Sequence, residues 1–271
     1  MENNGKKRNF TGCALSVRGA SHEETGGECQ DSARFFIGDN FAVAAVSDGH
    51  GSEKHFRSAS GSEMATRVAI RSICDFSERN CEKGGLDGIF RENAKNAARR
   101  IAANIICGWN SEIAAHIGLL PLNESERAIF DKYGGISNEV MYGATLIVGC
   151  LTEKGCFGLQ IGDGNFCALV GEEMISPVPE DAKLVGNLTT SLCDSDAISS
   201  FRWFYREGDF SGLVLSSDGL INSFLNESDF YSFGKRVLSA VENGSTSALA
   251  EHLKTRTRHG SRDDISVAAI V

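Results

Sequence analysis

Short apolar runs, gathered in two blocks along the chain, constrain the fold more than any other feature of the sequence. Most of these runs end at Gly, Asp or Ser and have the length and composition of strands. They predict strands at 10–17, 34–37, 41–46, 144–151, 156–161, 166–170, 212–216 and 265–271. Runs such as FAVAAV (41–46) contain no polar side chain, which indicates a strand buried on both faces.

A different pattern separates the two blocks of predicted strands. Apolar residues there recur every three or four positions and predict helices over about 52–74 and 90–117. A weaker repeat of the same kind predicts helices over 229–241 and 245–257. Helix pairs between runs of strands favour an α+β layered architecture with antiparallel sheets. Residues 171–200 have the composition of an irregular excursion.

Size, charge and cysteine spacing limit the class of protein. A chain of 271 residues with 41% hydrophobic content can bury the core of one large domain. A net charge of −9 argues against nucleic acid or an anionic membrane as a partner. Nine cysteines form no CxxC pair, and no apolar run approaches the roughly 18 residues needed to span a bilayer. We therefore expect reduced thiols and a cytoplasmic protein.

Acidic residues stand at the ends of several predicted strands. One alone is explained by a turn, because Asp-Gly is a common turn dipeptide and strands often stop there. Their recurrence at neighbouring strand ends is harder to explain in this way. The acids are Asp31, Asp48, Asp163, Asp218 and the pair Asp263 and Asp264.

Carboxylates gathered in one place repel one another unless a cation neutralises them. Oxygen ligands without Cys or paired His indicate Mg²⁺ or Mn²⁺ rather than zinc or copper. The carbonyl of Gly49, next to Asp48, is uncrowded and adds a further oxygen ligand. Two such ions about 3.5 to 4 Å apart can share a water, lower its pKa and hold a phosphoryl group. On the acids alone, a hydrolase of small phosphorylated metabolites stays an alternative.

Six short motifs follow one another along the chain: CQD (29–31), SDGHG (47–51), YGATL (142–146), IGDG (161–164), SSDGL (216–220) and GSRDDIS (260–266). In this order they resemble the metal-dependent PP2C (PPM) family of protein serine/threonine phosphatases. The resemblance covers residues 10–271, so we expect a polar tail at 1–9 and one domain over 10–271. It implies the PP2C-like α-β-β-α sandwich, with two antiparallel sheets flanked by helices. Residues 171–207 sit where family members carry a variable flap.

The resemblance implies a dinuclear Mg²⁺ or Mn²⁺ centre with assigned ligands. Asp48 would bridge two ions, and the Gly49 carbonyl would bind one of them. Asp218 and Asp263 would complete the shell of the first ion. Asp263 is preferred to Asp264 because the first acid of GSRDDIS matches the family's ligand position.

Three further residues receive roles from the same resemblance. Asp31 matches an acid that holds metal-bound waters, and Asp163 matches a residue of a third, weaker metal site. His50 matches a histidine proposed as the general acid for the leaving alkoxide. An ordinary histidine pKa near 6.5 suits that role at neutral pH.

Two positions depart from the family pattern. Gln30 stands where some members have Glu, so one metal contact is lost or replaced by water. Gly26 stands where the phosphate-binding arginine is expected, five residues before Asp31. Arg18 and His22 are the candidates to replace it, with binding by metal alone as the alternative. His22 by itself is better explained as a hydrogen-bonding loop residue.

The resemblance implies a monomer that hydrolyses phosphoserine and phosphothreonine in proteins and works opposite a cognate serine/threonine kinase. A rival interpretation is a catalytically weak PP2C-like domain that regulates or binds a phosphoprotein. Loss of the arginine favours the rival, whereas retention of Asp48, Asp218 and Asp263 favours the enzyme.

Overall fold

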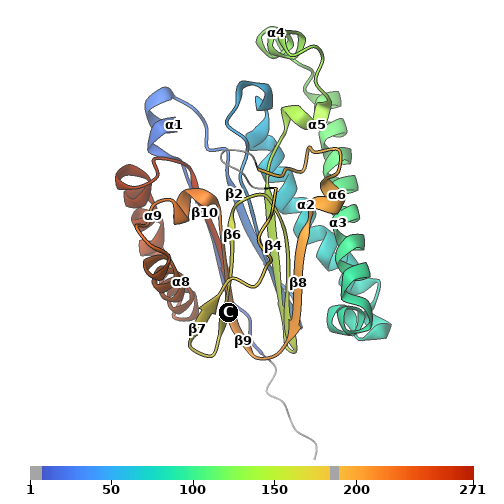
Figure 1. Ribbon diagram of the computed structural model, residues 1–271, viewed down its shortest axis with the longest axis vertical. Coiled ribbons are helices and arrows are strands. Elements are labelled where there is room, and N and C mark those ends of the chain that lie inside the picture. Colours follow the sequence, from blue (N-terminus) through green and yellow to red (C-terminus); the bar gives the residue numbers. More distant parts are fainter. Residues whose placement is uncertain (1–7, 184–188) are drawn as a thin grey trace, which may run out of the picture.

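The computed structural model describes residues 8–183 and 189–271 as four layers, with two sheets between two groups of helices (Figure 1). The strand order is β1-β10-β9-β6-β7 in one sheet and β2-β3-β4-β5-β8 in the other. Every pair of neighbouring strands is antiparallel. This confirms the predicted α-β-β-α sandwich.

The strands of the two sheets alternate in blocks along the chain. The first sheet contains β1 (Gly12–Val17), β6 (Asn165–Val170), β7 (Glu173–Ile175), β9 (Phe210–Ser216) and β10 (Ile265–Ile270). The second sheet contains β2 (Ser32–Ile37), β3 (Phe41–Ser47), β4 (Leu146–Thr152), β5 (Gly155–Ile161) and β8 (Arg202–Glu207).

The longer helices cover the outer faces of the sheets. The second sheet is covered by α2 (Ser58–Glu78) and α3 (Gly85–Leu119), and the first by α8 (Glu227–Glu242) and α9 (Ser247–His259) (Figure 1). Shorter helices are α1 (Ala20–Thr25), α4 (Glu124–Lys132), α5 (Asn138–Met141), α6 (Ala197–Ser200) and α7 (Asp218–Ile221), with 3-10 turns η1 (Glu53–His55) and η2 (Cys81–Lys83).

Burial on both faces explains the uninterrupted apolar run of β3. Successive side chains of a strand point to opposite faces. Val43 and Ala45 pack with α2 and α3, whereas Ala42, Ala44 and Val46 pack between the two sheets. These two groups belong to two separate clusters of apolar side chains, and a third such cluster fills the space between the first sheet and helices α8 and α9. Three apolar layers therefore hold the four structural layers together.

The prediction of an irregular excursion over 171–200 was wrong at its start, where the strand β7 lies. The segment 171–207, predicted to be a flap, also contains the strand β8. Each of these two missed strands is the last one of its sheet. An edge strand is buried on fewer sides and needs no continuous apolar run. β7 has three residues, and β8 (RWFYRE) has no fully buried residue. Residues 184–188 of this segment lie outside the described part of the chain.

The four predicted helices are confirmed, with shifted ends. The helix predicted over 52–74 begins at Ser58, and the one predicted over 90–117 begins at Gly85. Helix α4 was missed although its N-terminus carries a capping box, in which Asn123 and Glu126 each bond the other's backbone N–H. No helix in residues 8–183 and 189–271 is long and apolar enough to cross a membrane.

Candidate metal centre

The acids at the strand ends meet at one end of the sandwich. Ser32, the first residue of β2, pairs with Ser47, the last residue of β3, so Asp31 and Asp48 flank the same end of one sheet. In the other sheet Ser216 at the end of β9 pairs with both Asn165 of β6 and Val267 of β10. Asp163, Asp218 and Asp263 precede or follow these residues by two to four positions and so share that end.

Five of the predicted ligands line a single cavity of about 200 Å³. They are Asp48, Gly49, Asp163, Asp218 and Asp263, and His50, His22, Gln30, Thr145 and Asp264 also line it. No Lys or Arg is among the described residues that line this cavity. The cavity therefore gathers negative charge without a protein cation to balance it.

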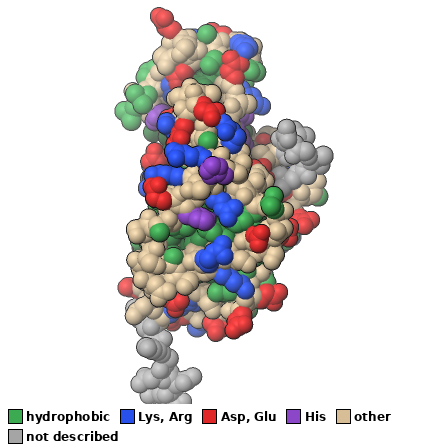
Figure 2. Space-filling model, turned by 90° about the vertical axis from the view of Figure 1, so that its left-hand side faces the viewer, with side chains coloured by type: hydrophobic (Ala, Val, Ile, Leu, Met, Phe, Trp, Pro, Cys, Tyr) green, Lys and Arg blue, Asp and Glu red, His purple; other side chains and the backbone are tan. Residues whose placement is uncertain are grey.

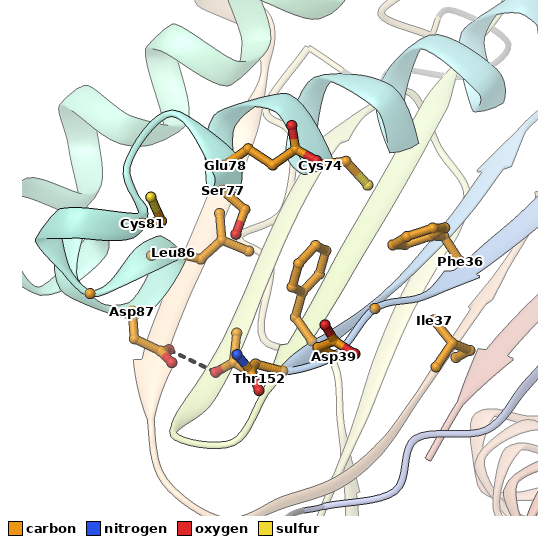
Figure 3. A pocket seen from close by; sticks show the side chains of 15 residues that line it. Phe36, Ile37, Asp39, Cys74, Ser77, Glu78, Cys81, Leu86, Asp87 and Thr152 are labelled. Atoms are coloured by element: carbon orange, nitrogen blue, oxygen red, sulfur yellow. Dashed lines mark hydrogen bonds between the residues drawn. The ribbon is translucent and has the colours of Figure 1, made fainter.

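A larger cavity, of about 1020 Å³, lies elsewhere. It is lined by the β2–β3 hairpin, the end of α2 and the start of α3, and includes Phe36, Asp39 and Asp87 (Figure 3). The two cavities lie at opposite ends of β3. Phe41, the first residue of this strand, lines the larger cavity, and Ser47, the last residue, precedes Asp48 of the small one. None of the predicted site residues lines the larger cavity, so the small acidic cavity is the candidate site.

Asp31 lies behind the cavity rather than in its wall. Its side chain is 8% exposed, and its Oδ2 accepts a 2.6 Å hydrogen bond from Ser217 Oγ. Its Oδ1 is buried and has no hydrogen-bond partner among the described residues. A buried carboxylate oxygen without a partner is costly. It fits a site completed by an ion or by water.

Burial and mutual repulsion raise the pKa values of these carboxyls. The pKa of Asp48 is raised well above its ordinary value, first by burial and then by Asp31, Asp218 and Asp263. Burial, partly offset by the Ser217 hydrogen bond, raises the pKa of Asp31 to about 8. The pKa of Asp218 is also raised, by burial and then by Asp163. Ionising the cluster at neutral pH therefore calls for a cation.

The residues fit a hydrated divalent ion better than a cage made of side chains alone. No three His, Cys, Asp or Glu side chains in the described ranges already stand in position around one point. Magnesium-type ions keep several waters and bind through one or two carboxylates. Repulsion between charged carboxylates also keeps them apart when nothing neutralises them. The donor set, all oxygen, suits Mg²⁺ or Mn²⁺.

Asp263 and Asp264 have different environments. Asp264 is 3% exposed, and its two carboxylate oxygens each accept a 2.6 Å bond, from Gly19 N–H and from Gln30 N–H. His22 Nδ1 also lies 3.0 Å from Asp264 Oδ1. Asp263 is exposed, and among the described residues its carboxylate accepts a bond only from Asp264 N–H, at 2.9 Å. Asp264 therefore holds two loops together, and Asp263 faces the cavity more openly.

The loop that carries Asp263 is conformationally strained. Arg262 has φ 65°, a left-handed conformation that few residues other than glycine adopt. Its backbone carbonyl accepts bonds from Ser21 N and Ser21 Oγ, and its guanidinium pairs with Glu24 at 2.6 Å. Strain of this kind persists where surrounding contacts over-determine the backbone. These contacts fix Asp263 at the cavity edge.

Close backbone packing explains the glycine beside Asp48. A Cβ on Gly49 would lie 2.7 Å from the Gln30 carbonyl oxygen and 2.9 Å from that of Ser58. The backbone of Asp48 is held by Thr145, whose N–H donates to the Asp48 carbonyl at 2.8 Å and whose hydroxyl accepts from Asp48 N–H at 3.1 Å. Thr145 therefore holds the backbone of Asp48 through both its own backbone and its side chain.

His50 lies in the cavity wall, and its Nε2 lies 2.7 Å from Ser191 Oγ. Its ring centroid is 4.8 Å from that of His55. Burial, followed by the charges of His55 and Lys54, lowers the pKa of His50 to about 4. The ring is therefore neutral at pH 7 before substrate binds. Sequence reasoning gave no sign of His55 or Ser191, because neither stands in a motif with His50.

The structure also places the residues around the missing arginine. Gly26 ends α1 in a left-handed conformation with φ 75°, which an arginine adopts only with strain. Arg18 is exposed, and its Nη1 donates to the Gly27 carbonyl at 3.2 Å, one residue away from Gly26. His22 is hydrogen-bonded to Asp264 as expected, but it lies in helix α1 rather than in a loop.

The sandwich with its acid-lined cavity defines a phosphatase-type α-β-β-α fold. A sequence profile described as protein phosphatase 2C matches residues 18–255, and the chain belongs to this family. No curated protein matches the chain significantly.

Solved structures of bacterial phosphatases share the fold. The catalytic domain of the serine/threonine phosphatase PstP, in complex with two manganese ions, is 18% identical with a TM-score of 0.55, covering 96% of this chain and 97% of that one. Stp1 from Staphylococcus aureus is 14% identical with a TM-score of 0.59, covering 100% and 99%. PppA from Pseudomonas aeruginosa is 15% identical with a TM-score of 0.58, covering 97% of both.

Proposed function

We propose that this protein is a metal-dependent protein serine/threonine phosphatase that hydrolyses phosphoserine and phosphothreonine with water. The observation that carries the proposal is the convergence of Asp48, Asp163, Asp218 and Asp263 on one cavity without a balancing Lys or Arg. Family membership over residues 18–255 supports it. The direct attack of water needs no phosphoenzyme, and no buried cysteine is reactive, since burial raises the pKa of thiols such as Cys167 to about 12.

Asp48, the Gly49 carbonyl, Asp218 and Asp263 are the proposed ligands of two Mn²⁺ or Mg²⁺ ions, with Asp163 at a third site. When bound, such ions lower the pKa of water and neutralise the charge of the phosphoryl group. The PstP structure with two manganese ions supports this number of ions for the fold.

The chain's own residues orient the reactants. The buried Asp31 Oδ1, without a hydrogen-bond partner in the described residues, is available to accept a bond from a water and orient it. The exposed Arg18 guanidinium, beside Gly27, is the proposed contact for substrate phosphate in place of an arginine at position 26.

His50 is the proposed proton donor to the leaving serine or threonine oxygen. It lines the cavity, and its Nε2 would exchange Ser191 Oγ for that oxygen. A phosphate ester with two negative charges favours the protonated ring, which opposes the burial that lowers the pKa of His50.

Hydrolysis assays decide between the proposal and its rivals. With Mn²⁺ added, the protein should hydrolyse nitrophenyl phosphate and phosphothreonine peptides, and EDTA should stop both reactions. Asp48→Asn should lower turnover by at least a hundred-fold at unchanged circular dichroism. Faster hydrolysis of nucleotides or sugar phosphates than of phosphopeptides would replace the protein substrate by a metabolite. No hydrolysis of any ester by folded, Mn²⁺-loaded protein would favour the regulatory domain.

A further inference from the structure

Helix α9 and the turn after it carry a concentration of cationic side chains on an acidic protein. The stretch HLKTRTRHGSR (252–262) contains three arginines, one lysine and two histidines without any Asp or Glu, whereas the whole chain has a net charge of −9. Figure 2 shows Lys, Arg and His side chains in a broken band down the middle of one face of the molecule. This face includes α8 and α9, which form the left-hand side of Figure 1.

Two of these cations and a neutral histidine rest on a pair of aromatic rings. The rings of Phe224 and Phe233 have centroids 5.6 Å apart. The guanidinium of Arg256 lies 4.0 Å from the Phe224 centroid, and that of Arg236 lies 5.8 Å from the Phe233 centroid. The His252 ring stacks on Phe233 at 5.2 Å with an interplanar angle of 17°. We call Arg236, His252 and Arg256 the cationic cluster.

The cationic cluster has no carboxylate partner among the described residues, although its neighbours do. Lys254 pairs with Glu251 at 2.7 Å, Arg258 with Glu23 at 3.6 Å and Arg262 with Glu24 at 2.6 Å. Arg256 Nε donates to His252 Nε2 at 3.4 Å, and burial, followed by the charges of Arg256 and Arg236, lowers the pKa of His252. Arg236 and His252 are exposed, so an anion can reach them from solvent.

The cluster is also connected to the candidate metal centre. Arg256 Nη1 donates to the Ser223 carbonyl at 3.1 Å. Ser223 comes five residues after Asp218, in the turn that follows helix α7. Asn222, next to Ser223, donates through Nδ2 to Asp218 Oδ2 at 3.0 Å. A peptide whose phosphorylated residue enters the cavity can therefore extend over the cluster.

We propose that the cationic cluster binds an acidic segment of the phosphoprotein substrate, several residues away from the phosphorylated one. This rests on the proposed function. Guanidinium groups held on aromatic rings lose little freedom on binding and form strong hydrogen bonds with carboxylates. The cations are spread over two helices on an open face, which suits the carboxylates of an extended chain. Charge of this kind also speeds encounter with an acidic partner.

Two labelled phosphothreonine peptides test the proposal by fluorescence anisotropy at low salt in EDTA, where no turnover occurs. One carries Glu and the other Gln at positions four to seven residues from the phosphothreonine on both sides. The wild type should bind the Glu peptide about five-fold more tightly. Arg236→Glu should abolish this preference. With Mn²⁺, the same preference should appear as a lower KM and disappear in Arg236→Glu.

Arg100→Glu is the matched control, because the Arg100 guanidinium on α3 also lies over a ring, 5.3 Å from the centroid of Phe76. It should keep the preference for the Glu peptide. Equal binding of both peptides by the wild type, or an equal loss in Arg100→Glu, would overturn the proposal. Nitrophenyl phosphate hydrolysis by the wild type is measured alongside. If it fails, the proposed function fails, while a preference in EDTA that depends on Arg236 still supports the docking surface.

Discussion

Asp263 and Asp264 show how two adjacent residues of the same type come to differ. Asp264 uses both carboxylate oxygens to hold the backbone of Gly19 and Gln30. Asp263 accepts one short-range bond from the Asp264 N–H at 2.9 Å and otherwise faces solvent and the cavity. Both residues stand before β10 begins at Ile265, so the contacts of each side chain and not strand alternation make the difference.

The two acids should therefore fail in different ways when changed to Asn. Asp264→Asn leaves only one carbonyl oxygen for two backbone donors, and we expect unfolding free energy to fall by about 2–3 kcal/mol. Asp263→Asn should change stability by less than about 0.5 kcal/mol but remove most Mn²⁺-dependent turnover. Urea unfolding and nitrophenyl phosphate hydrolysis measure the two effects. A large loss of stability in Asp263→Asn would contradict the assignment.

His50 offers a second test at the level of one side chain. Only an alkoxide leaving group needs a proton, because nitrophenolate is stable as an anion. His50→Ala should therefore slow hydrolysis of a phosphothreonine peptide at least ten-fold more than hydrolysis of nitrophenyl phosphate. The ratio of kcat values for the two substrates, in wild type and variant, measures this. Equal losses on both substrates would show that His50 does not act as the acid.

At the level of elements, close backbone approach between helix α2 and the segment before β4 positions the site. A Cβ on Gly61 of α2 would lie 1.9 Å from the Tyr142 carbonyl oxygen, and Trp109 Nε1 of α3 donates to the Gly61 carbonyl at 2.9 Å. Tyr142 is the first residue of the YGATL motif, and the same motif brings Thr145 to the backbone of Asp48. The packing of two helices thus supports the loop that carries a proposed ligand.

A pair of glycine substitutions tests this packing. Gly61→Ala should lower the free energy of unfolding by about 3 kcal/mol, because the backbone atoms it meets belong to packed elements. Gly118→Ala, near the end of α3, meets nothing within 4 Å and should raise it by about 0.5 kcal/mol through helix propensity. Thermal or urea unfolding of both variants measures the contrast. Similar values for the two would mean that α2 moves freely away from Tyr142.

At the level of the whole molecule, the acidic cavity joins the two sheets. Asp31 and Asp48 come from the β2–β3 side and Asp218 and Asp263 from the β9–β10 side. Ser217 of one side bonds Asp31 of the other at 2.6 Å. An ion held between these acids would therefore stabilise the contact between the sheets as well as the site.

Manganese should raise the melting temperature. At a concentration about a hundred times the dissociation constant, binding to the folded state adds about 2.7 kcal/mol, or roughly 5–10 °C for a chain of this size. Asp48→Asn should lose at least half of this shift. Differential scanning fluorimetry with and without Mn²⁺ measures it. An unchanged shift in Asp48→Asn would exclude Asp48 as a ligand.

The metal-free protein should become less stable as pH rises from about 4 to 8. Burial raises the pKa of Asp31 to about 8, so the folded state binds a proton that the unfolded chain has released, and each step upward in pH favours unfolding. Urea unfolding in EDTA at pH 5, 6.5 and 8 should show the fall. Asp31→Asn should make the fall smaller, and Asp48 and Asp218, whose pKa values are also raised, account for the remainder. A rise in stability over this range would contradict the sign.

Local sequence was sufficient for the central strands, the four long helices and the acids at strand ends. Central strands such as β3 are buried on both faces, and an amphipathic helix repeats its apolar residues with its own period. The edge strands β1 and β2 were predicted as well, whereas β7 has only three residues and β8 is only partly buried, so neither of these two has such a pattern. The capping box at the start of α4 could have predicted this helix, but α4 has no buried residue and therefore no clear apolar repeat.

By itself, the sequence determined that the chain forms a layered sandwich and that carboxylates follow its strands, because burial and turn chemistry act on neighbouring residues. Only the tertiary structure decided which carboxylates share a cavity, that Asp264 is occupied by backbone donors, and that Arg236, His252 and Arg256 gather over Phe224 and Phe233. Those contacts join residues far apart in the chain, and their energies depend on distance in space rather than on order in sequence.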